Sequence, residues 1–385
     1  MDISVLKERI NQENCDAYVI YDSAENCDMR YLSGFLASDP YLYLCKRDGA
    51  ECLIVASMEE LRATRESRCP VISRTAAGFT KYIEDGCKTD EAAAKMLKTC
   101  CTGAPETRCR LLVPYSMPTG FAHALSAEAE VVIDLDTIAR MRAVKTPEEL
   151  DKIRQVQKEN ERGVHQAIDI IKKAEIDEHN GLVFENKPLT SEMIKKIIHE
   201  IFYEHGLEDR DTIISCAGDT ALPHARGEGQ LLAYQPIVMD VFPRGNNGYF
   251  ADMTRTVSKG KPSDEICAMY KTVHNAKELA RKMIRPGITG AEVHNAVAEY
   301  FRTCGYETAG TSGFIHSLGH GVGLAIHESP SLSPRGEVLV PGNVITIEPG
   351  LYYPGTGGVR LEDMGAVTKT GFDTFTTFEE DLIIA

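Results

Sequence analysis

The sequence has no long apolar run, no excess of basic residues and no CxxC motif, and each absence excludes a class of protein. A membrane-spanning helix needs roughly 18 to 20 apolar residues, and no stretch approaches this length. Residues 1–18 interleave acidic and basic side chains without an apolar core, unlike a secretion signal. The formal net charge of −15 disfavours a nucleic-acid partner, because phosphates need clustered Lys and Arg. We therefore expect a protein that binds neither membranes nor nucleic acid.

The twelve cysteines do not form a disulfide pattern. None belongs to a CxxC motif, and Cys100 and Cys101 are adjacent, which frustrates ordinary disulfide geometry. Without a secretion signal, reduced and mostly buried thiols are the expected state. We therefore expect a cytoplasmic protein.

The length of 385 residues is too great for one ordinary hydrophobic core and predicts two domains or three. The first ~135 residues alternate short apolar strands with helical segments, which predicts a small α/β domain. A long helix is expected after Thr146, because Thr146 is a good N-cap, Pro147 suits the first turn and Glu149 completes a capping box. We place the boundary before this helix, which gives domains 1–138 and 139–385.

The second domain contains an internal repeat. Two predicted helices each follow a Thr and have apolar residues four and eight positions later, a Phe at twelve and a Gly at sixteen. The matching pairs are Thr190 and Thr289, Ile194 and Val293, Ile198 and Val297, Phe202 and Phe301, and Gly206 and Gly305. The shared length and stop signal favour a duplication over two unrelated amphipathic helices.

Each repeat continues into apolar strands that contain two acids, Asp240 and Asp252 in the first, Glu348 and Glu362 in the second. A single acid of this kind would be read as a surface residue. Four at matching positions indicate a shared site, because a buried carboxylate needs a cation or a metal. With one histidine, the donor set suits Mn²⁺, Co²⁺ or Zn²⁺. Five ligands exceed what one open site uses, so two ions fit better.

The segment HSLGHGVGLAIHE at 316–328 has three histidines and three readings: a zinc site on one helix, ordinary core histidines, or part of a site whose other members lie elsewhere. In a helical zinc site the residue after the first His would be Glu, but Ser317 stands there, and the glycines disfavour a helix. An extended, glycine-rich strand that brings backbone close to a substrate is more plausible, and it would place His316 and His320 on one face. His224, in ALPHARG, is isolated, and both a site role and an ordinary surface role stay open.

Five motifs in this order resemble the Xaa-Pro peptidases, aminopeptidase P and prolidase, of the pita-bread metallopeptidase superfamily. They are ALPHARG, VMDVF with GYFADMTRT, HSLGHGVGLAIHE, VITIEPGLYY and GVRLEDMGAV, within residues 216–368. The segments DAYVIYDSAENCDMRYLSGF and ARMRAVKTPEELDKIR resemble the N-terminal domain and junction of that family. The resemblance implies an α/β protein with a C-terminal pita-bread catalytic domain, built as a pseudo-twofold duplication, and a smaller creatinase-like N-terminal domain. It also implies a homodimer.

The resemblance further implies a role for each site residue. Two divalent ions, Mn²⁺ in the first instance and Co²⁺ or Zn²⁺ as alternatives, would be bridged by Asp252 and Glu362. Asp240 would bind one ion, and His320 with Glu348 the other. The residues that would hold the substrate or move protons are His224, His316 and His327. Arg360 lies two residues before Glu362, so on a strand it shares that face and could orient the carboxylate or the substrate.

One segment departs from the family pattern. The sequence between Asp240 and Asp252 has one residue more than we expect, and Val241 and Phe242 replace small residues. We interpret this as a longer hairpin tip at 245–248, where insertions are tolerated. The ligands stay intact, but the shape of the pocket is expected to differ.

The resulting functional hypothesis is hydrolysis of the bond between the N-terminal residue of a peptide and a proline at the second position. A metal-bridged water would become hydroxide, Glu348 would pass its proton to the leaving nitrogen, and His327 or His316 would stabilise the oxyanion. An Xaa-Pro dipeptidase (prolidase) is the main alternative. A metal-free creatinase-like hydrolase is disfavoured because all the acid ligands are present, and a non-catalytic binding module also stays open.

Overall fold

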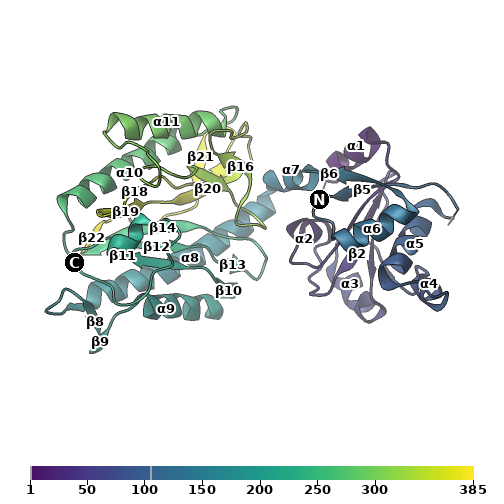
Figure 1. Ribbon diagram of the computed structural model, residues 1–385, viewed down its shortest axis with the longest axis horizontal. Helices are drawn as coiled ribbons and strands as arrows, with labels where there is room; N and C mark the ends of the chain where they lie inside the picture. Colours follow the sequence, from purple (N-terminus) through teal and green to yellow (C-terminus); the bar gives the residue numbers. More distant parts are fainter. Residues whose placement is uncertain (1, 105) are drawn as a thin grey trace. The chain divides into compact units, whose positions relative to one another are not determined.

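The structure is a computed structural model that describes residues 2–104 and 106–385. The chain divides between Arg142 and Ala143 into two compact units (Figure 1). The boundary predicted near residue 138 falls inside α7 (Thr137–Ala143). Helices and strands are mixed in both units, so the predicted α/β class is confirmed. Within the described ranges, no helix is both long enough and apolar enough to cross a membrane.

The N-terminal unit is built on one six-stranded sheet. Its strands are β1 (Ala17–Asp22), β2 (Tyr41–Lys46), β3 (Glu51–Val55), β4 (Val71–Ser73), β5 (Arg110–Pro114) and β6 (Glu130–Asp134), in the order β4-β3-β2-β1-β5-β6. The helices of this unit are α1 (Ser4–Gln12), α2 (Cys27–Ser33), η1 (Ser57–Glu59), α3 (Glu60–Glu66), α4 (Phe79–Glu84), α5 (Thr89–Thr102), α6 (Thr119–Glu128) and α7. Leu97 of α5 and Phe121 of α6 belong to one core with Val19 and Leu111 of the sheet, so alternate strand residues face these helices.

All twelve cysteines are free thiols in the structure. Four are buried, seven are half-buried and Cys304 is exposed. The thiols are therefore less completely buried than expected, because several lie at the margins of the N-terminal core, where Cys52, Cys100 and Cys101 pack against it from outside.

Four helices frame the C-terminal unit: α8 (Pro147–Lys173), α9 (Ser191–Glu204), α10 (Asp264–Met283) and α11 (Gly290–Thr303). The predicted capping box of α8 is present, since Glu149 N–H donates to Thr146 Oγ1 and Thr146 N–H donates to Glu149 Oε2. The two repeat helices α9 and α11 both span 14 residues and begin after a capping Thr. They end just before Gly206 (φ 72°) and Gly305 (φ 86°), which take the left-handed conformation that glycine permits.

The strands of the C-terminal unit form two main sheets. One has the order β11-β12-β14-β22, with β11 (Ile213–Cys216), β12 (Ile237–Val241), β14 (Met253–Lys259) and β22 (Ile383–Ile384). The other has the order β16-β15-β17-β20-β21, with β15 (Gly319–Gly321), β16 (Glu328–Leu332), β17 (Val344–Ile347), β20 (Asp363–Val367) and β21 (Phe372–Thr374). Figure 1 shows α8 and α9 on one side of these strands and α10 and α11 on the other. Each sheet therefore has its own helix pair (Figure 1), which agrees with the predicted duplicated architecture.

Shorter elements complete this unit. They are β7 (Glu175–Ile176), β8 (Leu182–Phe184), β9 (Lys187–Pro188), β10 (Leu207–Glu208), η2 (Ala217–Ala221), β13 (Arg244–Gly245), β18 (Gly350–Tyr353) and β19 (Gly357–Arg360). The predicted hairpin tip at 245–248 is a turn, in which Gly248 N–H donates to Gly245 O over 2.7 Å.

Candidate metal centre

The four predicted acids lie at equivalent places in the two sheets. Asp240 is on β12, which pairs antiparallel with β14, and Asp252 directly precedes β14. Glu348 directly follows β17, which pairs antiparallel with β20, and Glu362 directly precedes β20. In each half, one antiparallel strand pair therefore brings two acids, 12 residues apart in the first half and 14 in the second, to neighbouring strand ends.

A cavity of about 530 Å³ collects every residue that the sequence indicated for the site. Its lining includes Asp240, Asp252, Glu348, Glu362, His224, His316, His320, His327 and Arg360. The isolated His224 is therefore brought to the same place as the histidines of 316–328.

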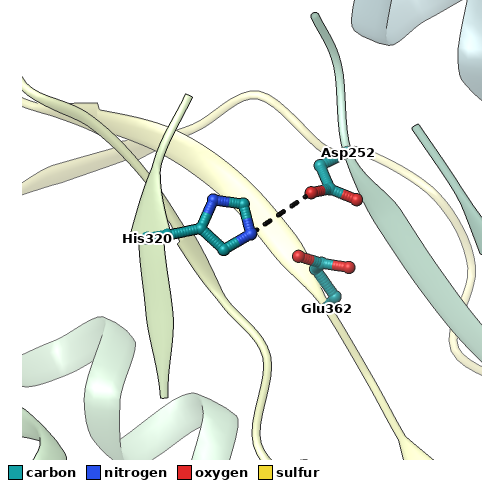
Figure 2. Close-up of side chains that lie close together, drawn as sticks. All are labelled: Asp252, His320 and Glu362. Atoms are coloured by element: carbon teal, nitrogen blue, oxygen red, sulfur yellow. Dashed lines mark ion pairs between the residues drawn. The ribbon is translucent and has the colours of Figure 1, made fainter. Parts of the chain in front are cut away.

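Three of these side chains point toward one another (Figure 2). One ligand atom from each of Asp252, His320 and Glu362 lies within 4.8 Å of the others. His320 Nε2 is 3.5 Å from Asp252 Oδ2 and 3.4 Å from Glu348 Oε1. His320 Nδ1 lies 3.1 Å from Gly321 O, and a proton on Nδ1, donated to this carbonyl, would leave the lone pair of Nε2 for a cation between the ring and the carboxylates.

Glycines allow the strand that carries His320 to lie tightly between its neighbours. A Cβ on Gly319 would stand 2.1 Å from Thr346 O, and one on Gly321 would stand 2.5 Å from Glu328 O. Gly319 lines the cavity and Gly321 is not among its lining residues, and the expectation that these glycines bring backbone close to a substrate stays a prediction. The close approach at both positions is to backbone of the adjacent strands β17 and β16.

Asp240 is oriented by the buried Arg360. Arg360 Nη2 lies 2.5 Å from Asp240 Oδ2, and its Nη1 donates to Tyr352 Oη over 2.8 Å. Arg360 Nε donates to Thr254 Oγ1 over 3.1 Å. Arg360 therefore contacts Asp240 directly and reaches Glu362 only through Thr254, whose hydroxyl donates to Glu362 Oε2 over 2.8 Å.

His316 is held by a chain of hydrogen bonds. Burial, with the charge of Arg360, lowers the pKa of His316 to about 4, so the ring is neutral. Its Nδ1 lies 2.7 Å from Ser317 O and its Nε2 lies 3.0 Å from Tyr352 Oη. Burial raises the pKa of Tyr352 to about 12, so this phenol keeps its proton and donates it to Nε2. His327 differs, because it is exposed and packs edge-on against His320 with ring centroids 4.2 Å apart.

Comparison with known proteins decides the family. Residues 151–369 match the model of metallopeptidase family M24, and residues 3–144 match that of the creatinase/prolidase N-terminal domain. The chain belongs to metallopeptidase family M24. The resemblance read from the five motifs is confirmed.

This M24 chain is similar to Xaa-Pro peptidases over nearly its whole length. It is 32% identical to an Xaa-Pro dipeptidase of Pyrococcus furiosus over 340 residues, 87% of each chain. Its structure is similar to the prolidase of Pyrococcus horikoshii OT3, with a TM-score of 0.81, 28% identity and 99% of both chains covered. It is also similar to an X-Pro aminopeptidase of Thermotoga maritima, with a TM-score of 0.80, 25% identity and coverage of 98% of this chain and 100% of the other.

The charge distribution of the centre fits the divalent ions that an M24 metallopeptidase implies. Burial, followed by the charge of Glu362, raises the pKa of Asp252 well above its ordinary value, and burial likewise raises that of Glu362. Burial raises the pKa of Glu348 to about 8. Glu362 Oε1 is buried and, among the described residues, accepts no hydrogen bond. Converging carboxylates with an unsatisfied oxygen and a neutral imidazole are a donor set that a hard or borderline cation would complete.

Several contributors to the centre were not identified from the sequence. Thr254 bonds Glu362, Thr346 Oγ1 accepts from His320 N–H over 3.1 Å, and Tyr352 joins His316 to Arg360. The sequence offered one signal for Thr254. It lies two residues after Asp252, so alternation along a strand puts both side chains on the same face. Val241 and Phe242 stand where the family pattern has small residues. Phe242 lines the cavity, whereas Val241 is fully buried in the core.

Divalent ions are expected to stabilise this M24 chain strongly. Chelator-treated protein should show a Tm about 5 to 10 °C higher with Mn²⁺ at roughly 100 times its Kd, because binding to the folded state alone contributes about 2.7 kcal/mol. Excess chelator should reverse the shift. A Tm that does not respond to Mn²⁺, Co²⁺ or Zn²⁺ would contradict the metal centre.

Proposed function

We propose that the chain removes the N-terminal residue from peptides with proline at the second position, as a dinuclear Xaa-Pro aminopeptidase. The proposed ligands are Asp240, Asp252, His320, Glu348 and Glu362. The observation that carries the proposal is the convergence of these acids and His320, from two duplicated sheets, in a cavity also lined by His224, His316 and His327. The named relatives support the proline preference, since they are Xaa-Pro peptidases.

In the proposed mechanism, two divalent ions supply a Lewis acid and a water that ionises near neutral pH. Glu348 Oε1 accepts the proton of the attacking water and returns it to the leaving nitrogen of proline. In the metal-free protein, burial raises the pKa of Glu348 to about 8. Occupied by cations, the centre would lower that pKa again, so the carboxylate is available as a base.

The histidines and Arg360 orient the reacting groups. His327 stands at the exposed side of the cavity and can donate to the developing oxyanion. His224 lines the same cavity and is the second donor proposed to hold the substrate. Neutral His316 is fixed through Tyr352, while Arg360 keeps Asp240 aimed at the centre.

A peptide longer than two residues fits the cavity chemistry better than a dipeptide. A dipeptide has a free carboxylate directly after proline, and its capture calls for a cation. Among the described residues that line the cavity, Arg360 is the only Lys or Arg. Its guanidinium is already engaged with Asp240, Tyr352, Thr254 and Pro223 O. The dipeptidase is the second candidate, because the P. furiosus relative has that name.

Paired substrates test this proposal. Metal-depleted protein supplied with Mn²⁺ should release Ala from Ala-Pro-Ala with a kcat/KM at least about tenfold above that for Ala-Pro, since the carboxylate of Ala-Pro lacks an available cation. Ala-Ala-Ala is the control for the proline requirement. Cleavage of Ala-Pro alone would identify a dipeptidase, and no cleavage of either peptide with any divalent ion would refute the peptidase.

Three finer points belong to the same proposal. Mn²⁺ is proposed as the working ion because the donor set is mostly carboxylate oxygen. A cytoplasmic location is proposed from the twelve free cysteines. A homodimer stays a prediction from the family resemblance, to be measured by light scattering.

A further inference from the structure

A buried ion pair lies beneath the bend that carries His327. Lys145 Nζ is 2.6 Å from Glu328 Oε1, and both side chains are 2% exposed. Glu328 follows His327 directly and begins β16, whereas Lys145 precedes the N-cap of α8. Neither Lys145 nor Glu328 is among the residues that line the cavity. The pair is therefore outside the centre described above but one residue away from it.

The Glu328 carboxylate folds back and closes the bend formed by residues 323–327. Ala325 N–H points to Glu328 Oε2 at 3.4 Å, and Gly323 N–H donates to Ala325 O over 3.0 Å. A Cβ on Gly323 would stand 2.2 Å from Glu328 Oε1, so the carboxylate packs against this glycine. Ile326 and His327 of this bend line the cavity.

Lys145 is itself fixed to the segment that leads to Glu348. Lys145 N–H donates to Gly342 O over 2.9 Å, and Asn343 Nδ2 donates to Ala143 O over 2.8 Å. Residues 342–343 directly precede β17, and Glu348 follows that strand. The ion pair therefore connects the backbone that carries His327 to the backbone that carries Glu348.

Stability alone does not account for such a pair. Removing two charges from water is costly, and apolar residues of similar volume often replace a buried pair without loss of stability. What an ion pair provides and an apolar pair does not is a fixed direction, because Glu328 is held between Lys145 and Ala325 N–H.

We propose that Lys145 and Glu328 are positioning residues that set the place of His327 and Ile326 relative to Glu348. The kinetic consequence rests on the proposed peptidase function, but the structural consequence does not. Without the pair, the bend at 323–327 opens more often, and His327 meets the substrate in the reactive position less often.

The test is the double variant Lys145→Met/Glu328→Gln, which removes both charges and keeps the shape and the acceptor for Ala325 N–H. We expect a Tm close to that of the parent protein and a kcat for Ala-Pro-Ala about 10- to 100-fold lower at similar KM, as for a small misplacement of a reacting group. Amide hydrogen exchange at residues 323–327, measured on the metal-free protein, should be about tenfold faster. The matched control is Lys98→Met/Glu128→Gln, the same changes at an ion pair of the N-terminal unit. It should alter neither the kcat nor the hydrogen exchange at residues 323–327.

A second variant keeps the test decisive if the double variant does not fold. In Gly323→Ala the new methyl group displaces the Glu328 carboxylate without removing either charge, and it should give the same slower kcat and faster exchange. Parental kcat and parental exchange at 323–327 in the folded variant would overturn the inference. If the parent protein cleaves no Xaa-Pro peptide, the proposed function fails, whereas the exchange comparison still decides the role of the pair.

Discussion

Replacement of Asp252 by Asn is expected to lower kcat/KM for Ala-Pro-Ala by about a thousandfold or more, equivalent to roughly 4 kcal/mol of transition-state stabilisation. Asp252 is 4% exposed and lies with His320 and Glu362 in the one cluster, among the described residues, whose ligand atoms converge within 4.8 Å. Asn keeps the shape but contributes a neutral oxygen, so it no longer offsets the charge of a bound cation. The same variant should also lose most of the Tm increase produced by Mn²⁺.

The stability of the metal-free variant should move in the opposite direction. Burial and the charge of Glu362 raise the pKa of Asp252 well above its ordinary value, so at neutral pH the unoccupied fold bears a cost for this carboxylate. Asn removes that cost, and the metal-free Tm should equal or exceed that of the parent protein. A simple folding defect would instead lower activity and Tm together.

The control for Asp252→Asn is Asp39→Asn, an exposed acid of the N-terminal unit that should change neither activity nor Tm. Full activity of Asp252→Asn with added metal would show that the assigned ligands are wrong. Steady-state kinetics and calorimetry, each with and without Mn²⁺, separate these outcomes.

The parts of the fold that could be predicted from the sequence are those specified by local chemistry. The capping box at Thr146 and the shared pattern of α9 and α11 depend on residues within a few positions of one another. The four acids could also be identified, because a charged residue in an apolar strand is costly and the duplication repeats it. Their convergence in one cavity follows from the duplicated topology.

Contacts between residues distant in sequence could not be predicted in this way. Lys145 and Glu328 are 183 positions apart. In its own segment, each would be taken for an ordinary surface residue. Tyr352 belongs to the motif VITIEPGLYY, but its hydrogen bonds to His316 and Arg360 depend on how β18 and β19 pair. Gly321 illustrates the same limit, because the neighbour that requires a glycine belongs to another strand.

A second buried charge cluster, also undetected in the sequence, lies directly behind Glu362. Lys277 of α10 is completely buried and makes ion pairs with Asp363 and Glu380. Arg255 Nη2 lies 2.9 Å from Asp363 Oδ1, and Arg255 Nη1 donates to Glu362 O over 2.6 Å. Burial would raise the pKa of Asp363, but the charges of Arg255 and Lys277 outweigh it and hold that pKa below the ordinary value. Asp363 is thus a structural anion, although it adjoins a proposed ligand.

Lys277→Met is therefore expected to destabilise the protein by about 3 to 5 kcal/mol, because it leaves Glu380 and part of the Asp363 charge without their buried cation. For a unit of this size, the Tm should fall by roughly 10 °C. The exposed Lys282 lies on the same helix, and Lys282→Met should change the free energy of unfolding by no more than about 0.5 kcal/mol.

The double variant Lys277→Met/Glu380→Gln separates the lost charge pair from lost packing. Asp363 keeps Arg255 as its partner, and the amide that replaces the Glu380 carboxylate is neutral, so a substantial part of the stability should return, as in a double-mutant cycle. Urea unfolding of the metal-free proteins gives each free energy. A Lys277→Met protein as stable as Lys282→Met would show that the ion pairs of Lys277 contribute no net stability.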